Sequence, residues 1–246
     1  MKKNEFKTEG IYLAYDHGME HGPKDFNEKT ISAEYVIDIA KKAEVDAIIL
    51  LKGTARVYYK KNIGIPLILK LNQKTSMRGG EPISTQTCSV KEAISLGASA
   101  VGYTVYSGSE YEQVMLQEFG KIEEEAHRYG MPVIMWSYPR GKSVADDESP
   151  ETIAYAARIA LEMGADIVKI KYPDDDSKLK WIVKSAGKTK VFMAGGKAVT
   201  DEEFEEHVRH VINAGFSGVA VGRNIWQSDD PITRIKRIRS IIDSSR

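Results

Sequence analysis

The chain has 246 residues, of which 42% are hydrophobic and 28% are charged, so it can bury a sizeable core behind a polar surface. Lys and Arg number 35, and Asp and Glu also number 35, a balance that argues against a nucleic-acid scaffold and against a polybasic membrane binder. The single cysteine, Cys88, excludes an intrachain disulfide framework and a cysteine-rich zinc site.

The start of the chain, residues 1–10, is polar and has no apolar segment behind its lysines, so no secretory signal is predicted. No apolar run approaches the roughly 18 residues that a membrane span needs. These features predict a soluble, cytoplasmic protein whose partners include neither nucleic acid nor a membrane.

Short apolar runs alternate with longer amphipathic segments along the whole chain. The runs are rich in Ile, Val and Leu without polar alternation, which is typical of parallel strands covered on both faces. The predicted strands cover residues 11–15, 46–51, 66–71, 98–105, 132–137, 166–171, 190–194 and 217–221.

The segments between these runs have apolar residues at helical spacing, most clearly in residues 34–40 and 151–163. Several of them end in a glycine directly before the next strand, as expected of a left-handed residue that closes a helix. These glycines are Gly97, Gly130, Gly164 and Gly215.

Eight strand–helix units in this length predict a single-domain (β/α)₈ TIM barrel over residues 1–246. A doubly wound open sheet is the alternative, but no Gly-x-Gly-x-x-Gly follows the first strand. In a barrel the loops after the strands carry the chemistry. The most polar of these loops are residues 17–29, 72–87 and 138–149.

Residues 17–21 have the H-x-x-E-H pattern of the inverted zinc proteases. Zinc binding of that kind needs both histidines on one face of a helix, whereas Gly18, Gly22 and Pro23 predict a loop. We therefore favour a polar loop that faces a substrate at the barrel mouth, and predict no metal site.

Lys169 and Lys171 lie at the end of the sixth predicted strand and should point the same way, because they are two residues apart. They could simply reach solvent or pair with carboxylates. Alternatively, burial beside a second cation lowers the pKa of one amine and makes it a nucleophile for carbonyl groups. A Schiff-base lysine is the hypothesis that the barrel geometry favours, because strand ends form the catalytic rim.

Tyr138 follows the fifth predicted strand and Asp16 ends the first. The tyrosine could be a core residue or an acid/base group of the rim, and the aspartate could cap a helix or belong to the same rim. Beside lysines we expect the phenol of Tyr138 to ionise more easily, which suits proton transfer.

Two glycines follow the seventh strand, and Gly222 and Arg223 follow the eighth. Gly195 and Gly196 could serve as turn residues only. In TIM barrels, however, the loops after strands seven and eight recurrently bind phosphate through backbone N–H groups. Arg223 adds a planar donor fork, so the two loops together predict a phosphate site.

Several motifs in this order resemble the archaeal-type class I fructose-bisphosphate aldolases, which are metal-independent (β/α)₈ enzymes of archaea and some bacteria. The resemblance runs over nearly the whole length. One departure concerns the loop after strand seven, where the family's Gly-Gly-Pro is Gly195-Gly196-Lys197 here. The segments that carry the resemblance are 14–23, 66–72, 95–104, 136–141, 169–172 and 221–227.

The resemblance implies that Lys169, the first lysine of the K-x-x-Y stretch, forms the Schiff base. It further implies that Tyr138 is the acid/base group and that Asp16 orients hydroxyls, while Lys171 would lower the pKa of Lys169. The residues expected to bind the substrate and its phosphate are Gly195, Gly196, Gly222, Arg223, His21 and Lys171.

The implied activity is the reversible cleavage of fructose 1,6-bisphosphate to dihydroxyacetone phosphate and glyceraldehyde 3-phosphate, in glycolysis or gluconeogenesis, without a cofactor. The family's ring-like assemblies imply a homo-oligomer. Alternatives are a Schiff-base lyase or transaldolase-like synthase of aromatic precursors, and a non-catalytic sugar-phosphate binding protein. A metal-dependent aldolase is the weakest alternative.

Overall fold

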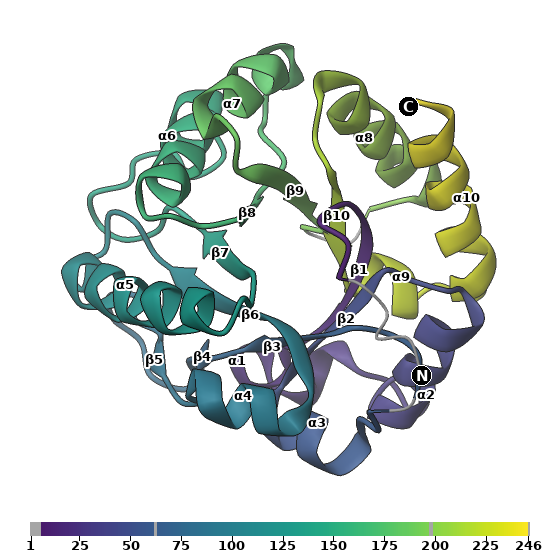
Figure 1. The fold of residues 1–246 in the computed structure, drawn as a ribbon. Helices are drawn as coiled ribbons and strands as arrows, with labels where there is room; N and C mark the ends of the chain where they lie inside the picture. Colours follow the sequence, from purple (N-terminus) through teal and green to yellow (C-terminus); the bar gives the residue numbers. More distant parts are fainter. Residues whose placement is uncertain (1–5, 62, 197–198, 246) are drawn as a thin grey trace.

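The computed structural model describes residues 6–61, 63–196 and 199–245. Parallel strands close into a barrel in the order β1-β10-β9-β8-β7-β6-β3-β2 (Figure 1). This closure confirms the predicted barrel and excludes the open sheet. The barrel strands are β1 (Gly10–Tyr15), β2 (Ala47–Leu51), β3 (Leu67–Lys70), β6 (Ala98–Val105), β7 (Val133–Ser137), β8 (Ile167–Ile170), β9 (Lys190–Ala194) and β10 (Gly218–Val221).

Helices surround the barrel (Figure 1), and side chains or glycines cap several of their ends. The side chains of Ser89 and Thr200, for example, accept hydrogen bonds from the first turns of α4 and α8. Gly97 and Gly215 close the same two helices in left-handed conformations. The helices are α1 (Gly18–His21), α2 (Ala33–Lys42), α3 (Lys52–Tyr58), α4 (Val90–Leu96), α5 (Glu112–Arg128), α6 (Pro150–Glu162), α7 (Leu179–Ala186), α8 (Asp201–Ala214), α9 (Arg223–Trp226) and α10 (Pro231–Ser244). Among the described residues, none of these helices has the length and apolarity to cross a bilayer.

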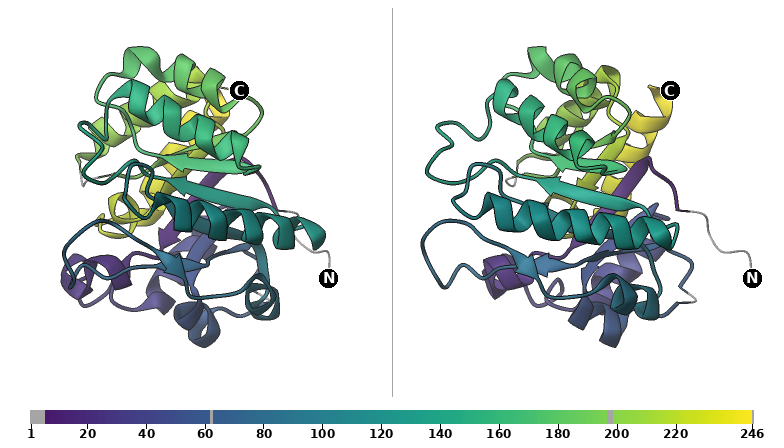
Figure 2. Two further views of the ribbon diagram at one scale, coloured as in Figure 1. Left: turned by 90° about the vertical axis from the view of Figure 1, so that its left-hand side faces the viewer. Right: turned by 60° about the vertical axis from the view of Figure 1, so that its left-hand side comes forward.

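Two of the predicted loops contain short elements of their own. The H-x-x-E-H stretch, expected to be a loop, forms the single helical turn α1 and is followed by the 3₁₀ helix η1 (Pro23–Asp25). The loop after β3 contains the antiparallel pair β4 (Asn72–Gln73) and β5 (Thr85–Gln86). The side views place α1 and this pair at the same end of the barrel (Figure 2).

The core has two layers, one between the strands and the helices and one inside the barrel. Large rings fill the inside: Tyr12 stacks on Phe192 with ring centroids 4.3 Å apart. Near the mouth the ring of Trp136 lies against Gly102 of the neighbouring strand, where an added Cβ would be 1.6 Å from Trp136 Cζ3. The indole is held in this position because β6 offers no side chain there.

We expect Gly102→Ala to lower the free energy of unfolding by about 1–3 kcal/mol, the usual cost of overpacking a core, because the Trp136 ring must move. Urea unfolding measures the change. Gly53→Ala in α3 is the matched control, since an added Cβ there meets nothing within 4 Å. That variant should be neutral or gain up to about 1 kcal/mol, and equal stability of the two variants would contradict the packing described.

Candidate active site

The carboxyl ends of the barrel strands surround a cavity of about 590 Å³. Every residue that the sequence analysis assigned to catalysis or to binding lines this cavity. These residues are Asp16, His21, Tyr138, Lys169, Lys171, Gly195, Gly196, Gly222 and Arg223. Neither the volume nor the proximity of these side chains follows from the sequence alone.

Strand alternation decides which side chains point into the barrel. Ala14, Ile68, Ile134 and Ile167 belong to the interior core. Residues two positions further along a strand share that direction, so each of these four strands ends in, or is directly followed by, a functional group directed inward. These groups are Asp16, Lys70, Trp136 with the following Tyr138, and Lys169, and all of them line the cavity.

Lys169 is the buried amine of the site, with 6% of the residue exposed. Its Nζ lies 5.3 Å from the centre of the Trp136 ring. Burial, together with the positive charge of Lys70, lowers the pKa of Lys169 to about 8, although Asp16 acts in the opposite direction. About one amine in ten is then neutral at pH 7, so Lys169 can act as a nucleophile.

Lys70 is the second cation of the site, and the sequence analysis gave it no role. It ends β3, is 5% exposed and forms an ion pair with Asp16 at 3.3 Å. Its Nζ also faces the Trp136 ring at 5.8 Å. The signal that could have found it is the one used for Lys169: a lysine at the end of an otherwise apolar strand.

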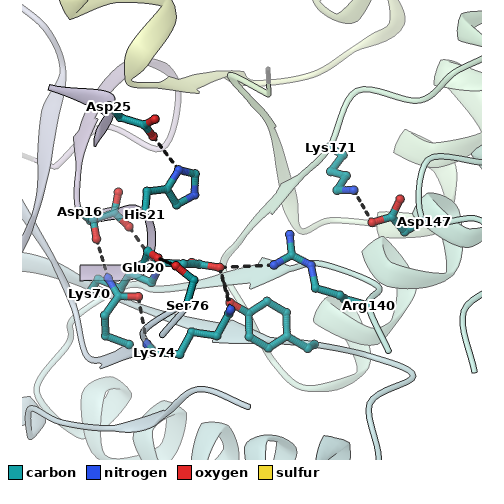
Figure 3. A network of polar contacts seen from close by, with 12 residues as sticks. Asp16, Glu20, His21, Asp25, Lys70, Lys74, Ser76, Arg140, Asp147 and Lys171 are labelled. Carbon is teal, nitrogen blue, oxygen red and sulfur yellow. Dashed lines mark hydrogen bonds and ion pairs between the residues drawn. The ribbon is translucent and has the colours of Figure 1, made fainter. Parts of the chain in front are cut away.

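Lys171 does not lower the pKa of Lys169, so this prediction is wrong. Strand β8 ends at Ile170, and the chain then turns away, so Lys171 forms ion pairs with Asp147 at 2.5 Å and Glu148 at 3.5 Å. Figure 3 shows this pair on the far side of the network from Lys70. The cation that acts on Lys169 is Lys70.

Asp16 is 4% exposed and remains a carboxylate. Burial acts to raise its pKa, but the charges of Lys70 and Lys169 outweigh that effect and lower the pKa below its ordinary value. The site therefore contains one buried carboxylate beside two ammonium groups, and this carboxylate can accept hydrogen bonds from substrate hydroxyls.

Tyr138 does not ionise more easily in this site, contrary to the expectation. Burial raises its pKa well above the ordinary value, and the negative charges of Asp16 and Glu20 add to the effect, while Arg140 opposes it. The physical reason is that burial disfavours the charged phenolate, and the nearby carboxylates add to this effect. In the free protein Tyr138 is a proton donor.

The loops after β9 and β10 contact each other through side chains and glycine backbone, and Asn224 Nδ2 donates to the carbonyl of Gly195 at 2.6 Å. An added Cβ on Gly222 would lie 2.6 Å from the carbonyl oxygen of Ala14, and one on Gly195 would lie 2.9 Å from Val221 Cγ2. Arg223 Nη2 donates to the carbonyl of Gly196 at 3.1 Å. An added Cβ on Gly196 would meet nothing within 4 Å, so there is open space beside the Arg223 guanidinium. The phosphate site itself stays a prediction, and Lys197 lies outside the described residues.

The two histidines of the H-x-x-E-H stretch lie edge to face, with ring centroids 5.3 Å apart, and each also has contacts of its own. His17 stacks on Trp226 with ring centroids 5.3 Å apart, and burial lowers its pKa to about 4, so its ring is neutral. His21 Nδ1 lies 2.6 Å from Asp25 Oδ2 and 3.5 Å from Arg223 Nη1. His21 therefore supports the arginine of the expected phosphate site.

A further cationic group, which the sequence analysis missed, lies at another part of the cavity wall. Lys74 and Arg140 both face the ring of Tyr106, at 5.9 and 5.2 Å, and both form ion pairs with Glu20 at 3.3 Å. In Figure 3 this cluster is separated from the His21–Asp25 pair. Glu20, Tyr106 and Arg140 line the cavity. The cavity therefore has two cationic regions, one at Arg223 and one at Arg140, with Lys74 beside Arg140 on Glu20.

A (β/α)₈ barrel with a buried, nucleophilic lysine at the end of a strand and cationic regions in the same cavity defines a lysine-dependent enzyme of carbonyl chemistry. Residues 11–228 match the family described as DeoC/LacD family aldolase, and the chain belongs to this family.

Individual relatives cover almost the whole chain. The class 1 fructose-bisphosphate aldolase of Thermoproteus tenax is 48% identical over 239 residues, which are 96% of this chain and 90% of the relative. The fructose-bisphosphate aldolase/6-deoxy-5-ketofructose 1-phosphate synthase of Methanocaldococcus jannaschii is 40% identical, covering 88% of this chain and 75% of the relative. An archaeal fructose-1,6-bisphosphate aldolase, solved with its catalytic lysine covalently bound to the carbinolamine intermediate, matches with a TM-score of 0.92 and 46% identity over 96% of this chain and 94% of that one.

We expect the reactivity of the Lys169 amine to rise with pH around a midpoint near 8, the value to which burial and Lys70 lower its pKa. Lys70→Met should raise this midpoint, because a positive charge is lost and Asp16 is left to stabilise the protonated amine. The rate at which a small acylating reagent modifies Lys169, followed by peptide mass mapping from about pH 6 to 10, gives the midpoint.

Lys171→Met is the matched control and should leave the midpoint in place, because that ammonium is paired with Asp147 and Glu148. A midpoint that moves in the Lys171 variant and stays fixed in the Lys70 variant would contradict the assignment.

Proposed function

We propose that the protein is a class I, metal-independent aldolase that reversibly cleaves fructose 1,6-bisphosphate to dihydroxyacetone phosphate and glyceraldehyde 3-phosphate. The observation that carries this proposal is the buried Lys169, whose pKa is lowered to about 8, in a cavity with two cationic regions. The aldolase relatives from archaea support the same assignment.

In the first step the neutral amine of Lys169 attacks the C2 ketone of the sugar, and the resulting carbinolamine loses water to form an iminium. The positive iminium nitrogen then withdraws electrons from the C3–C4 bond. No metal is needed in this scheme, because the iminium polarises the substrate. The ring of Trp136 beside Lys169 stabilises the cation that forms.

Tyr138 handles the proton of the C4 hydroxyl. In the direction of synthesis its protonated phenol delivers a proton to the aldehyde oxygen as the C3–C4 bond forms. In the direction of cleavage Tyr138 first gives its phenolic proton to the carbinolamine hydroxyl, which leaves as water. The resulting phenolate, which the positive iminium stabilises, then accepts the C4 hydroxyl proton while C3–C4 breaks. The enamine that remains is protonated at C3 and hydrolysed, which frees Lys169.

The two cationic regions suit a substrate with a phosphate at each end. We assign one phosphate to Arg223 with the loops of Gly195, Gly196 and Gly222, and the other to Lys74 and Arg140. Asp16, beside Lys169, orients the hydroxyls of the sugar. Substrate binding by Lys171 stays a prediction, since its ammonium is paired with Asp147 in the free protein.

A second candidate is a synthase that acts on a related sugar, because the relative from Methanocaldococcus jannaschii carries both activities in its name. The sugar in that name has one phosphate and no 6-hydroxyl. The Lys74–Arg140 pair favours a substrate with a second phosphate, and therefore favours fructose 1,6-bisphosphate. A non-catalytic binding protein needs only a charged lysine to hold a phosphate, so the lowered pKa of Lys169 favours an enzyme.

We further propose that residues 1–246 act as one catalytic domain. The cytoplasmic location, the place in glycolysis or gluconeogenesis and the homo-oligomeric assembly stay predictions that rest on the family resemblance.

Incubation with dihydroxyacetone phosphate followed by borohydride reduction should leave a stable adduct on Lys169, located by peptide mass mapping. The reason is that borohydride reduces the iminium to a secondary amine. Lys169→Met should leave no adduct, and Lys171→Met should still form one. An adduct on Lys171 would correct the residue, whereas binding of the ligand without any adduct would overturn the Schiff-base mechanism in favour of a binding protein.

Tyr138→Phe should lower the rate of fructose 1,6-bisphosphate cleavage by about 10²–10⁴-fold, the usual contribution of one general acid–base group. The measurement is kcat in a coupled assay. Tyr155→Phe, at an exposed position on α6, is the control and should keep the parental rate. A Tyr138→Phe protein with full activity would remove this residue from proton transfer.

A further inference from the structure

The helical turn after β1 places a carboxylate on the second cationic region of the free protein. A single oxygen of Glu20, Oε1, lies 3.3 Å from Lys74 Nζ and 3.3 Å from Arg140 Nη1. The hydroxyl of Tyr106 donates to the same oxygen at 3.4 Å. Figure 3 shows Glu20 in contact with this cluster.

One oxygen surrounded by three donors is the environment that a phosphate oxygen finds in an anion site. The carboxylate is ionised, since Lys70, Lys74 and Arg140 lower the pKa of Glu20 even though burial acts to raise it. The distances exceed the roughly 2.7–2.9 Å of a strong charge-assisted hydrogen bond. Lys74, Arg140 and Tyr106 are therefore positioned by Glu20 without forming short hydrogen bonds to it, and they can still bind a ligand.

The position of Glu20 is built into the fold. Its side chain is 16% exposed, and its backbone carbonyl accepts a hydrogen bond from the hydroxyl of Ser76 in the loop after β3. The 3₁₀ helix η1 that follows supplies a second carboxylate elsewhere, and Asp25 Oδ2 lies 3.3 Å from Arg223 Nη1. The loop after β1 thus brings one carboxylate to each cationic region.

We propose that Glu20 is a specificity-determining residue: its carboxylate occupies the place of one oxygen of the substrate's second phosphate and limits how tightly the Lys74–Arg140 pair holds a phosphorylated aldehyde. This inference rests on the proposed function. An incoming phosphate must share the three donors with Glu20 or displace it, and the repulsion between two anions weakens its binding. The same repulsion favours release of the phosphorylated aldehyde after cleavage.

Glu20→Gln tests this directly, because the amide keeps the shape of the side chain and removes its charge. In the direction of synthesis, with saturating dihydroxyacetone phosphate, the KM for glyceraldehyde 3-phosphate should fall about five- to thirty-fold. The KM for unphosphorylated glyceraldehyde should stay within about two-fold, since that aldehyde has no phosphate for Glu20 to repel. Glu20→Ala should shift the ratio of the two KM values in the same direction and serves if the amide variant does not fold.

Glu124→Gln makes the same chemical change at an exposed position on α5 and should alter neither KM. An unchanged or raised KM for glyceraldehyde 3-phosphate in the Glu20 variants would overturn the proposal. An equal fall for both aldehydes would also overturn it, by showing an effect on the shape of the cavity.

Failure of the proposed function is recognised separately, by the borohydride adduct. An adduct on Lys169 in the parent and in Glu20→Gln, together with unchanged KM values, rejects only the role of Glu20. Absence of the adduct in the parent rejects the aldolase mechanism itself.

Discussion

The functional centre depends on two ammonium groups held close to one indole ring and one carboxylate. Lys70 and Lys169 both face Trp136, and Asp16 pairs with Lys70. Burial without a partner would cost free energy for the ammonium groups of Lys70 and Lys169. The Asp16 carboxylate and the Trp136 ring offset that cost, so both lysines can remain charged inside the barrel. The same arrangement lowers the pKa of Lys169, because burial and the charge of Lys70 outweigh the opposing effect of Asp16.

The barrel supports this centre through packing far from the charges. The indole of Trp136 can lie across the open end of the barrel because Gly102 has no side chain. The apolar residues of the interior core pack against it. A closed sheet of parallel strands also ends every strand at one rim, which gathers groups from β1, β3, β7 and β8 around one substrate. The precision of the site therefore comes from rigid strands rather than from loops.

The loops supply charge balance around that rigid centre. The loop after β1 brings Glu20 of α1 to Lys74 and Arg140 and Asp25 of η1 to Arg223. Each group of cations that suits a phosphate is thus partly neutralised in the free protein. The H-x-x-E-H stretch has the spacing of a zinc motif. Here its histidines contact Trp226 and Asp25, and its Glu20 contributes to the charge balance.

The sequence by itself determined the strands, the principal helices, the closed barrel and the rim positions of Lys169, Tyr138 and Asp16, because apolar periodicity and strand-end polarity are local properties of the chain. Only the tertiary structure decided how these groups act on one another. It replaced Lys171 by Lys70 as the neighbouring cation, since β8 ends at Ile170 and the chain turns away. It also raised the pKa of Tyr138, because burial and two carboxylates from distant segments surround the phenol. Electrostatic effects of this kind depend on distances between residues far apart in the chain, which no local pattern encodes.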